Sequence, residues 1–225
     1  MRGVDEPDAR GRIHLDLTGR DLDRNPRIIV TDVRLLASAW HVLRATTFEY
    51  QHGDGRWSTE QRETYDRGNG ATVLLYDPEA ETVLLTRQFR YPAYVNGHPD
   101  GMMLETAAGL LDDDEPVAAI RREAVEETGF DIADPQHVFD VYMSPGSVTE
   151  KLHFYAARYR ASDRVSAGGG VEEEGEDIEV VELPFREALA AIGHTIVDAK
   201  TIMLLQWAAL SGPFKECWPP RASAR

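Results

Sequence analysis

Three glutamates, Glu123, Glu126 and Glu127, stand close together near the end of one segment in the middle of the chain. This segment, residues 109–130, begins with a glycine, continues through acids and a proline, and ends in Arg-Glu-Ala-Val-Glu-Glu-Thr-Gly-Phe. Acidic side chains are unfavourable at the C-terminal end of a helix, because the helix dipole repels them. A cation must offset them, and their hard oxygen ligands suit Mg²⁺ or Mn²⁺. The segment therefore predicts a divalent-metal site.

The same segment carries the signals of a helix with one buried face. Asp114 or Glu115 can cap its N-terminus, and Pro116 suits the first turn, where no amide hydrogen is needed. Gly129 suits the left-handed residue just past the end. At about 100° per residue, one stripe of the helix faces the core. The stripe consists of Val117, Ile120, Ala124 and Thr128.

The helix geometry ranks the three glutamates by their distance from the buried face. Glu123 and Glu127 flank the stripe at i and i+4, so they are the predicted inner ligands, and Glu126 lies farther round as a second-tier ligand. The alternative is a solvated acidic helix end with an Arg122–Glu126 ion pair. Charge runs are usually solvated surface, but the spacing of arginine, glutamates and glycine favours metal binding.

Length and charge limit the function classes that the chain can serve. Its 225 residues, 42% of them hydrophobic, suffice for one core plus a small accessory element. A net charge of −15 argues against general binding to nucleic acids or membrane surfaces, although a phosphorylated ligand is compatible with it. Cys217 is the single cysteine, and the sequence has no apolar run of membrane-spanning length and no signal core. The sequence thus predicts a cytoplasmic protein.

Apolar periodicity and turn residues divide the chain into four parts. Residues 1–26 form a predicted mobile extension, residues 27–66 a small antiparallel sheet, residues 67–211 the catalytic domain and residues 212–225 an irregular tail. Predicted strands cover residues 27–36, 42–50, 57–65, 71–76, 82–89, 103–107, 138–142, 152–159 and 178–183, and two later helices cover 184–192 and 199–210. This order indicates an α+β fold, an α/β/α sandwich with a mixed sheet. The small N-terminal sheet should pack on a partner or on the main domain.

The ending of the central segment resembles the signature of the Nudix hydrolases. Other segments are similar to the GDP-mannose pyrophosphatase branch of this family, a close relative of the ADP-ribose pyrophosphatases. They are residues 67–71, 87–90, 95–97, 108–112, 142–146 and 167–172, within a similarity that extends from about Arg27 to Leu210. The signature places seven residues between its upstream acid and the arginine. In this chain six residues separate Glu115 from Arg122. Counting back seven residues from Arg122 would make Asp114 the upstream acid instead. The shorter spacing is also similar to that of the same branch.

The resemblance implies a Mg²⁺-dependent homodimer, in which the N-terminal strands of one subunit lie over the active site of the other. It places metal ligands at the main-chain carbonyl of Ala108 and at Glu123 and Glu127. A further acid, which is also the implied general base, would come from a later acidic loop, as Glu176 or Glu174. The catalytic residues implied in this way are the four glutamates.

The resemblance also implies which residues contact the substrate. They are Trp40, Arg90, Ala108, Gly109, Leu110, Glu127, Glu150 and Lys200, joined by Gln61, Arg62 and Glu63 from the second subunit. Arg90 would hold phosphate, and Trp40 would lie against the base. Each also has a plainer interpretation, with Arg90 in a surface ion pair and Trp40 in a core or interface. Glu150 and Lys200, taken alone, would be ordinary surface charges.

The reaction predicted from this resemblance is hydrolysis of GDP-mannose to GMP and mannose 1-phosphate. The alternative enzyme is an ADP-ribose pyrophosphatase giving AMP and ribose 5-phosphate, because the signature does not choose the substrate. A non-catalytic nucleotide-sugar-binding module is a second alternative, but it would be expected to have lost helix glutamates. A structural dimerisation domain is a third, and it leaves the matches of Arg90 and Glu176 unexplained.

Overall fold

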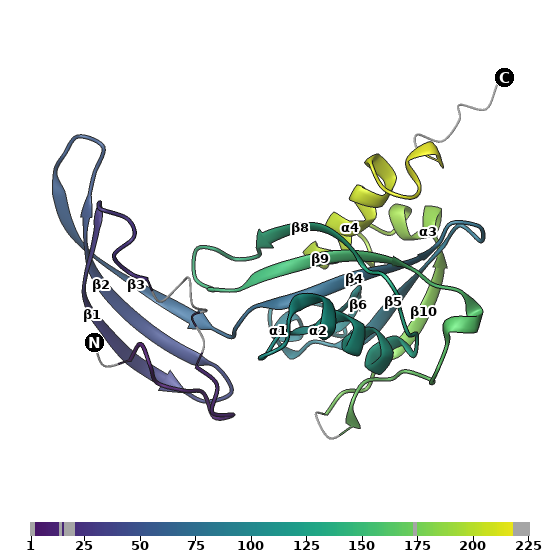
Figure 1. The fold of residues 1–225 in the computed structure, drawn as a ribbon, viewed down its shortest axis with the longest axis horizontal. Coiled ribbons are helices and arrows are strands. Elements are labelled where there is room, and N and C mark those ends of the chain that lie inside the picture. Colours follow the sequence, from purple (N-terminus) through teal and green to yellow (C-terminus); the bar gives the residue numbers. More distant parts are fainter. Residues whose placement is uncertain (1–2, 14, 16–20, 173–174, 218–225) are drawn as a thin grey trace. The chain divides into compact units, whose positions relative to one another are not determined.

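The computed structural model describes residues 3–13, 15, 21–172 and 175–217, and Figure 1 shows their secondary structure along the chain. The chain divides into two compact units. The first contains Met1–Gly70 and Val141–Leu152, and the second contains Ala71–Asp140 and His153–Arg225. No helix in the described ranges combines the length and the apolar character needed to cross a membrane.

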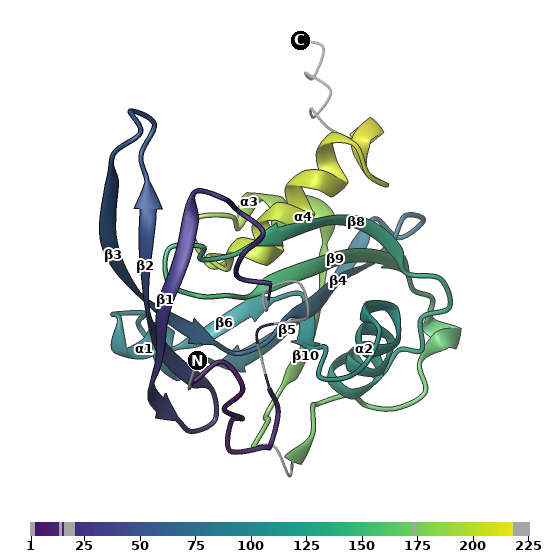
Figure 2. The same ribbon diagram turned by 60° about the vertical axis from the view of Figure 1, so that its left-hand side comes forward.

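The first unit is built on a three-stranded antiparallel sheet in the order β1-β2-β3. Its strands are β1 (Ile28–Ser38), β2 (Val42–Gln51) and β3 (Trp57–Asp66), which lie side by side in Figure 2. Strands β2 and β3 pair along their whole length without a shift in register. The small antiparallel sheet predicted from the sequence is therefore confirmed.

A buried ion pair anchors the N-terminal residues to this sheet. Arg44 on β2 donates a hydrogen bond to Asp66 on β3 at 2.6 Å, and both side chains are only 1% exposed. The same guanidinium donates to the main-chain oxygens of Gly3 and Glu6. The predicted extension over residues 1–26 thus contacts the sheet where the structure describes it. Substitution of either residue would leave the other charge buried without a partner. This should lower the free energy of unfolding by about 3–5 kcal/mol.

A seven-stranded mixed sheet forms the centre of the second unit. Its order is β10-β5-β4-β9-β8, with β6 paired to β5 and β7 paired to β4. The strands are β4 (Gly70–Asp77), β5 (Thr82–Phe89), β6 (Met102–Glu105), β7 (Ala107–Leu110), β8 (Gln136–Tyr142), β9 (Lys151–Arg158) and β10 (Glu179–Pro184).

Helices cover both faces of this sheet, as Figures 1 and 2 show. Helix α2 (Pro116–Glu123) lies on one face, and α3 (Phe185–Ala190) and α4 (Ala199–Leu210) lie on the other. A short helix, α1 (Tyr91–Val95), follows β5. This arrangement confirms the predicted α/β/α sandwich.

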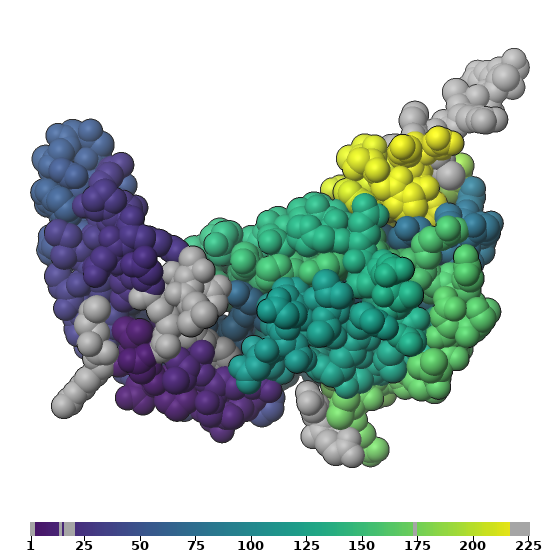
Figure 3. Space-filling model, in the orientation of Figure 1, coloured from purple at the N-terminus to yellow at the C-terminus, as the bar shows by residue number. Residues whose placement is uncertain are grey.

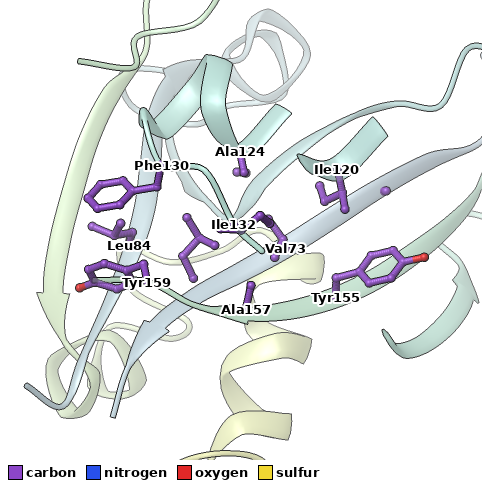
Figure 4. Close-up of a cluster of buried hydrophobic side chains, with 12 residues drawn as sticks. Val73, Leu84, Ile120, Ala124, Phe130, Ile132, Tyr155, Ala157 and Tyr159 are labelled. Carbon is purple, nitrogen blue, oxygen red and sulfur yellow. The ribbon is translucent and has the colours of Figure 1, made fainter. Parts of the chain in front are cut away.

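The alternation of side chains along β4 explains why both faces are covered. Val73 belongs to an apolar cluster with Ile120 and Ala124 from the α2 side, which Figure 4 shows in close-up. Its neighbour Thr72 points to the α4 side, where its hydroxyl hydrogen-bonds Thr106 at 2.8 Å. Successive residues of a strand face opposite ways, and a fully buried isoleucine contributes about 1.5–3 kcal/mol.

The structure corrects three local predictions. The single strand expected over 103–107 is two strands, because the Thr106 amide leaves the sheet and donates to Thr201 Oγ1 at 2.7 Å. The connection between β5 and β6 contains α1, which has a proline in its first turn and is too short to show a period. The tail predicted as irregular contains a 3₁₀ turn, Lys215–Cys217, and Phe214 stacks on Phe185 with centroids 4.0 Å apart.

Candidate active site

The predicted acidic helix is present, with one irregularity at its end. Helix α2 begins at Pro116 and continues into a π-helical turn, Ala124–Thr128, which ends at Gly129 in the left-handed conformation, with φ 81°. Glu115 occupies the N-cap position, but its side chain makes no capping hydrogen bond, so the predicted cap by Glu115 is wrong. A π turn is a frequent feature of functional sites, and this one carries two of the three glutamates.

Three of the four residues in the predicted buried stripe face the core. Ile120, Ala124 and Thr128 are buried, as expected. Val117 is 45% exposed, so its predicted place in the stripe is wrong. Burial begins at Ala119 and Ile120, so the core does not cover the first turn of the helix.

Two glutamates of this helix lie against strand β7. Glu127 is 3% exposed, and its Oε2 accepts a hydrogen bond from the Ala108 amide at 3.2 Å. Glu123 lies beside Gly109, where an added Cβ would be 2.1 Å from the glutamate carboxyl carbon. Only glycine leaves room for that carboxylate, which explains the glycine at the start of the motif. The two predicted inner ligands are thus next to Ala108 and Gly109, and Leu110 ends the same strand.

A glycine loop ties a further acid to the end of the helix. The amides of Gly169 and Gly170 donate to the main-chain oxygens of Glu127 and Glu126 at 3.0 and 2.9 Å. These bonds satisfy carbonyl groups that a helix end otherwise leaves without partners. Glu176 in turn accepts from the Val171 amide at 3.0 Å. The loop therefore holds Glu176 near the helix, whereas Glu174 lies outside the described residues.

The resulting cluster of carboxylates is electrostatically unfavourable. Burial, together with the charges of Glu123 and Glu176, raises the pKa of Glu127 to about 8. The positive charge of Arg90 and the Ala108 amide act in the opposite direction without reversing the shift. Acids that repel one another in a site with little water have the character of a cation site.

Glu126 lies at the more exposed side of the acid cluster, beside Arg122. Arg122 lies 3.3 Å from Glu126 and 3.0 Å from Glu123, so the i,i+4 pair of the alternative interpretation exists. The same guanidinium is 3.6 Å from Asp114. Glu126 is also more exposed than the two inner glutamates, as the helix geometry predicted.

A second cluster in the same unit pairs two cations with two acids. Glu105 on β6 accepts hydrogen bonds from Arg90, at 2.6 Å, and from Lys200 on α4. Lys200 also donates to Asp198 at 2.9 Å. Burial opposes ionisation of Glu105, but the attraction of Lys200 and Arg90 outweighs it and lowers the pKa of that carboxyl. Lys200 is buried, so its interpretation as a surface charge is wrong.

Sequence reasoning missed Glu105 and Asp198. Asp198 could have been found, because an aspartate directly before an apolar helix is a capping signal, and it accepts from the Thr201 amide at 2.9 Å. Glu105 offers a weaker signal, as one acid at the end of an apolar strand. Its partners lie 15 and 95 residues away in sequence.

The remaining predicted site residues lie in the first unit. Trp40 is 60% exposed, and the Arg10 guanidinium lies 5.0 Å from the centre of its ring. Glu150 is buried and lies 3.3 Å from Arg67, so its interpretation as a surface charge is also wrong. The residues predicted to reach a second subunit are exposed on β3, an edge strand of the small sheet; they are Gln61, Arg62 and Glu63.

Two family profiles match the chain in succession. The profile described as the GDP-mannose pyrophosphatase NudK N-terminal domain matches residues 27–65, and the NUDIX domain profile matches residues 66–207. Relatives named GDP-mannose pyrophosphatase match most of the chain. The Pectobacterium atrosepticum protein is 52% identical over 83% of this chain and 96% of its own length. The Yersinia enterocolitica protein is 55% identical over 80% of this chain and 94% of its own length.

Proposed function

The chain belongs to the Nudix hydrolases, and we propose that it hydrolyses GDP-mannose to GMP and mannose 1-phosphate. It is a Nudix pyrophosphohydrolase, because the NUDIX profile and the relatives extend over most of its length. The names of those relatives and the match of residues 27–65 support GDP-mannose as the substrate. The observation that carries the proposal is the convergence of Glu123, Glu127 and Glu176 at one helix end.

The acid cluster fits Mg²⁺, with Mn²⁺ as the alternative. The Ala108 carbonyl, Glu123, Glu127 and Glu176 would hold the metal, and Glu126 would serve from farther out. All are hard oxygen donors, and the raised pKa of Glu127 supports a cation there because the acids repel one another. When bound, the metal neutralises the pyrophosphate and acidifies water.

The other side chains bind the phosphates and move the proton. Arg90 orients a phosphate through charge-assisted hydrogen bonds, and Glu105 fixes the position of that guanidinium. Lys200 contacts the substrate from the same buried cluster. Glu176 takes the proton of the attacking water, on the loop that the glycine amides fasten to the helix. Glu174 is the alternative base.

We further propose a homodimer with shared active sites. Residues 27–66 expose five large apolar side chains, and exposed apolar surface of this kind can mark an interaction site. They are Ile29, Leu36, Trp40, Trp57 and Tyr65. In this proposal residues 27–66 form the dimer, Trp40 contacts the base and Gln61, Arg62 and Glu63 enter the other subunit's site. Glu150 contacts the substrate, and a cytoplasmic location agrees with the single cysteine.

Subunit mixing tests the shared site. Arg62→Ala and Glu127→Gln proteins, each inactive alone, would form heterodimers in which one of the two sites is intact. Random mixing should restore roughly a quarter of wild-type activity, because half of the dimers are mixed. Activity that stays at zero after the subunits have exchanged contradicts the shared site. Light scattering gives the oligomeric state independently.

A substrate panel tests the function. Mg²⁺-dependent release of phosphate, coupled to a phosphatase, is measured with GDP-mannose, GDP-glucose, ADP-ribose and ADP-glucose side by side. The expected result is the highest kcat/KM for GDP-mannose, lost in Glu127→Gln. A higher kcat/KM for ADP-ribose would contradict GDP-mannose as the substrate but would not contradict the proposed mechanism. Full turnover by Glu127→Gln would contradict the mechanism.

A further inference from the structure

A group of two histidines and an aspartate lies on two strands of the second unit, apart from the acids of the helix. His137 and Asp140 are on β8, and His153 is on β9. One oxygen, Asp140 Oδ1, lies 2.7 Å from His137 Nε2 and 2.8 Å from His153 Nδ1. All three ligand atoms are within 4.8 Å of one another. The three side chains therefore converge on one point.

The surroundings hold two of these side chains in place and leave one side open. The His137 ring packs edge-on against the buried Tyr155, with centroids 5.5 Å apart. The His153 side chain is only 14% exposed. The side chains of His137 and Asp140 are more open, on a strand at one end of the strand order, and β8 lies at the outer surface in Figure 3. Water can complete a coordination sphere from that side.

We propose that His137, Asp140 and His153 bind a transition-metal ion, of the class of Zn²⁺, Ni²⁺ or Co²⁺. Two imidazole nitrogens and one carboxylate oxygen suit these borderline ions, whereas Mg²⁺ prefers oxygen ligands alone. The aspartate charge offsets part of the metal charge. No residue of this group belongs to the acid cluster, so the protein carries two metal sites of different ligand chemistry.

The hydrogen-bonding pattern shows how the ion would enter. A neutral histidine donates through only one ring nitrogen, so both rings now direct a proton at Asp140 Oδ1. A metal ion in the same place would bind these two nitrogens through their lone pairs, and the single proton of each neutral ring would move, by exchange with water, to the other ring nitrogen. The ligand atoms need to separate only slightly from hydrogen-bond distances. A bound ion would fasten the edge strand β8 to β9.

Calorimetric titration with Zn²⁺, in excess Mg²⁺, tests the proposal. The expected result is one Zn²⁺ per chain that survives in Glu123→Gln/Glu127→Gln, where the acid cluster is disabled. His137→Gln should weaken this binding by at least as much as the loss of an outer-shell partner does, roughly 10- to 100-fold. His194→Gln, at an exposed histidine outside the group, is the matched control and should bind as the wild type does.

Three outcomes overturn the site. Zn²⁺ binding that disappears in Glu123→Gln/Glu127→Gln would belong to the acids. Equal binding by His137→Gln and wild type would place the ion elsewhere, and the absence of Zn²⁺ binding would leave a hydrogen-bonded cluster only. The imidazole resonances of His137 and His153 provide a second readout, because both should shift on addition of Zn²⁺ while that of His194 stays in place.

Discussion

Glu127 accepts a hydrogen bond from the Ala108 amide at 3.2 Å, and this contact joins the end of the acidic helix to strand β7. The bond favours the ionised carboxylate, yet burial and the neighbouring charges of Glu123 and Glu176 raise the pKa of Glu127 to about 8. The ionised form of this carboxylate is therefore unfavourable where it lies. A cation at the proposed metal site would offset the repulsion among these acids.

Glu127→Gln should stabilise the protein in the absence of metal at alkaline pH. The pKa in the folded state is above the ordinary value of 4.5, so the folded state binds a proton that the unfolded state has lost. Stability from this group is complete below about pH 4.5 and falls as pH rises towards 8. The glutamine should remove that loss, a gain of about 1–3 kcal/mol at pH 9. Urea unfolding in EDTA at pH 5 and 9 measures it, and an unchanged pH dependence contradicts the assignment.

Gly109→Ala should reduce activity while leaving the fold intact. The added Cβ would lie 2.1 Å from the Glu123 carboxyl carbon, so the flexible end of the glutamate must move. A displacement of this kind can lower kcat/KM about 100-fold, whereas the free energy of unfolding should change by less than about 1 kcal/mol. Gly53→Ala is the control, because nothing lies within 4 Å of its Cβ. An active Gly109→Ala protein would show that the Glu123 position is unimportant.

Local signals were sufficient for much of the fold. Helix α4 was predicted with its observed ends, because an apolar run fills its length, and the structure shows that Asp198 caps its start. Strand β5 was also predicted with its observed ends, and its apolar residues are bounded by turn residues. The positions of Glu123 and Glu127 beside the buried stripe followed from the helical period alone. In each case the determining residues are neighbours in sequence.

Features that depend on distant residues could not be predicted in this way. The strand break at Thr106 depends on Thr201 Oγ1, 95 residues away. Glu105 accepts hydrogen bonds from Arg90 and Lys200. Neither contact can be predicted from the residues next to Glu105 in the sequence. The exposure of Val117 depends on which turns of the helix the core covers, and the helical period does not give that information.

Glu105→Gln should destabilise the protein and lower activity together. Glu105 has a lowered pKa, so its contribution to stability is present above the ordinary value of 4.5 and is lost as pH falls through the folded-state value. The variant leaves Lys200 with Asp198 alone and should lose about 1–3 kcal/mol at pH 7. Chemical denaturation at pH 7 and pH 4 should show the difference shrinking in acid.

A double-mutant cycle separates the network from the single residue. Glu105→Gln/Lys200→Met removes the buried negative and positive charges together, so its loss of stability should be smaller than the sum of the two single losses. Additive losses would mean that the two side chains do not interact. Activity should stay low in the double variant if Lys200 contacts the substrate.

Arg90→Gln should lower kcat/KM far more than Arg87→Gln. The two arginines lie close together at the end of β5 and are similarly exposed, but their partners differ. Arg90 is held at 2.6 Å by the buried Glu105, and its charge acts on Glu127. Arg87 pairs with the exposed Glu179 at 3.4 Å, a surface pair worth about 0–1 kcal/mol. Steady-state kinetics should give a loss of roughly 100-fold for Arg90→Gln and wild-type values for Arg87→Gln. Equal losses would show that the general positive charge of the strand end matters, and that the contact with Glu105 does not select the phosphate ligand.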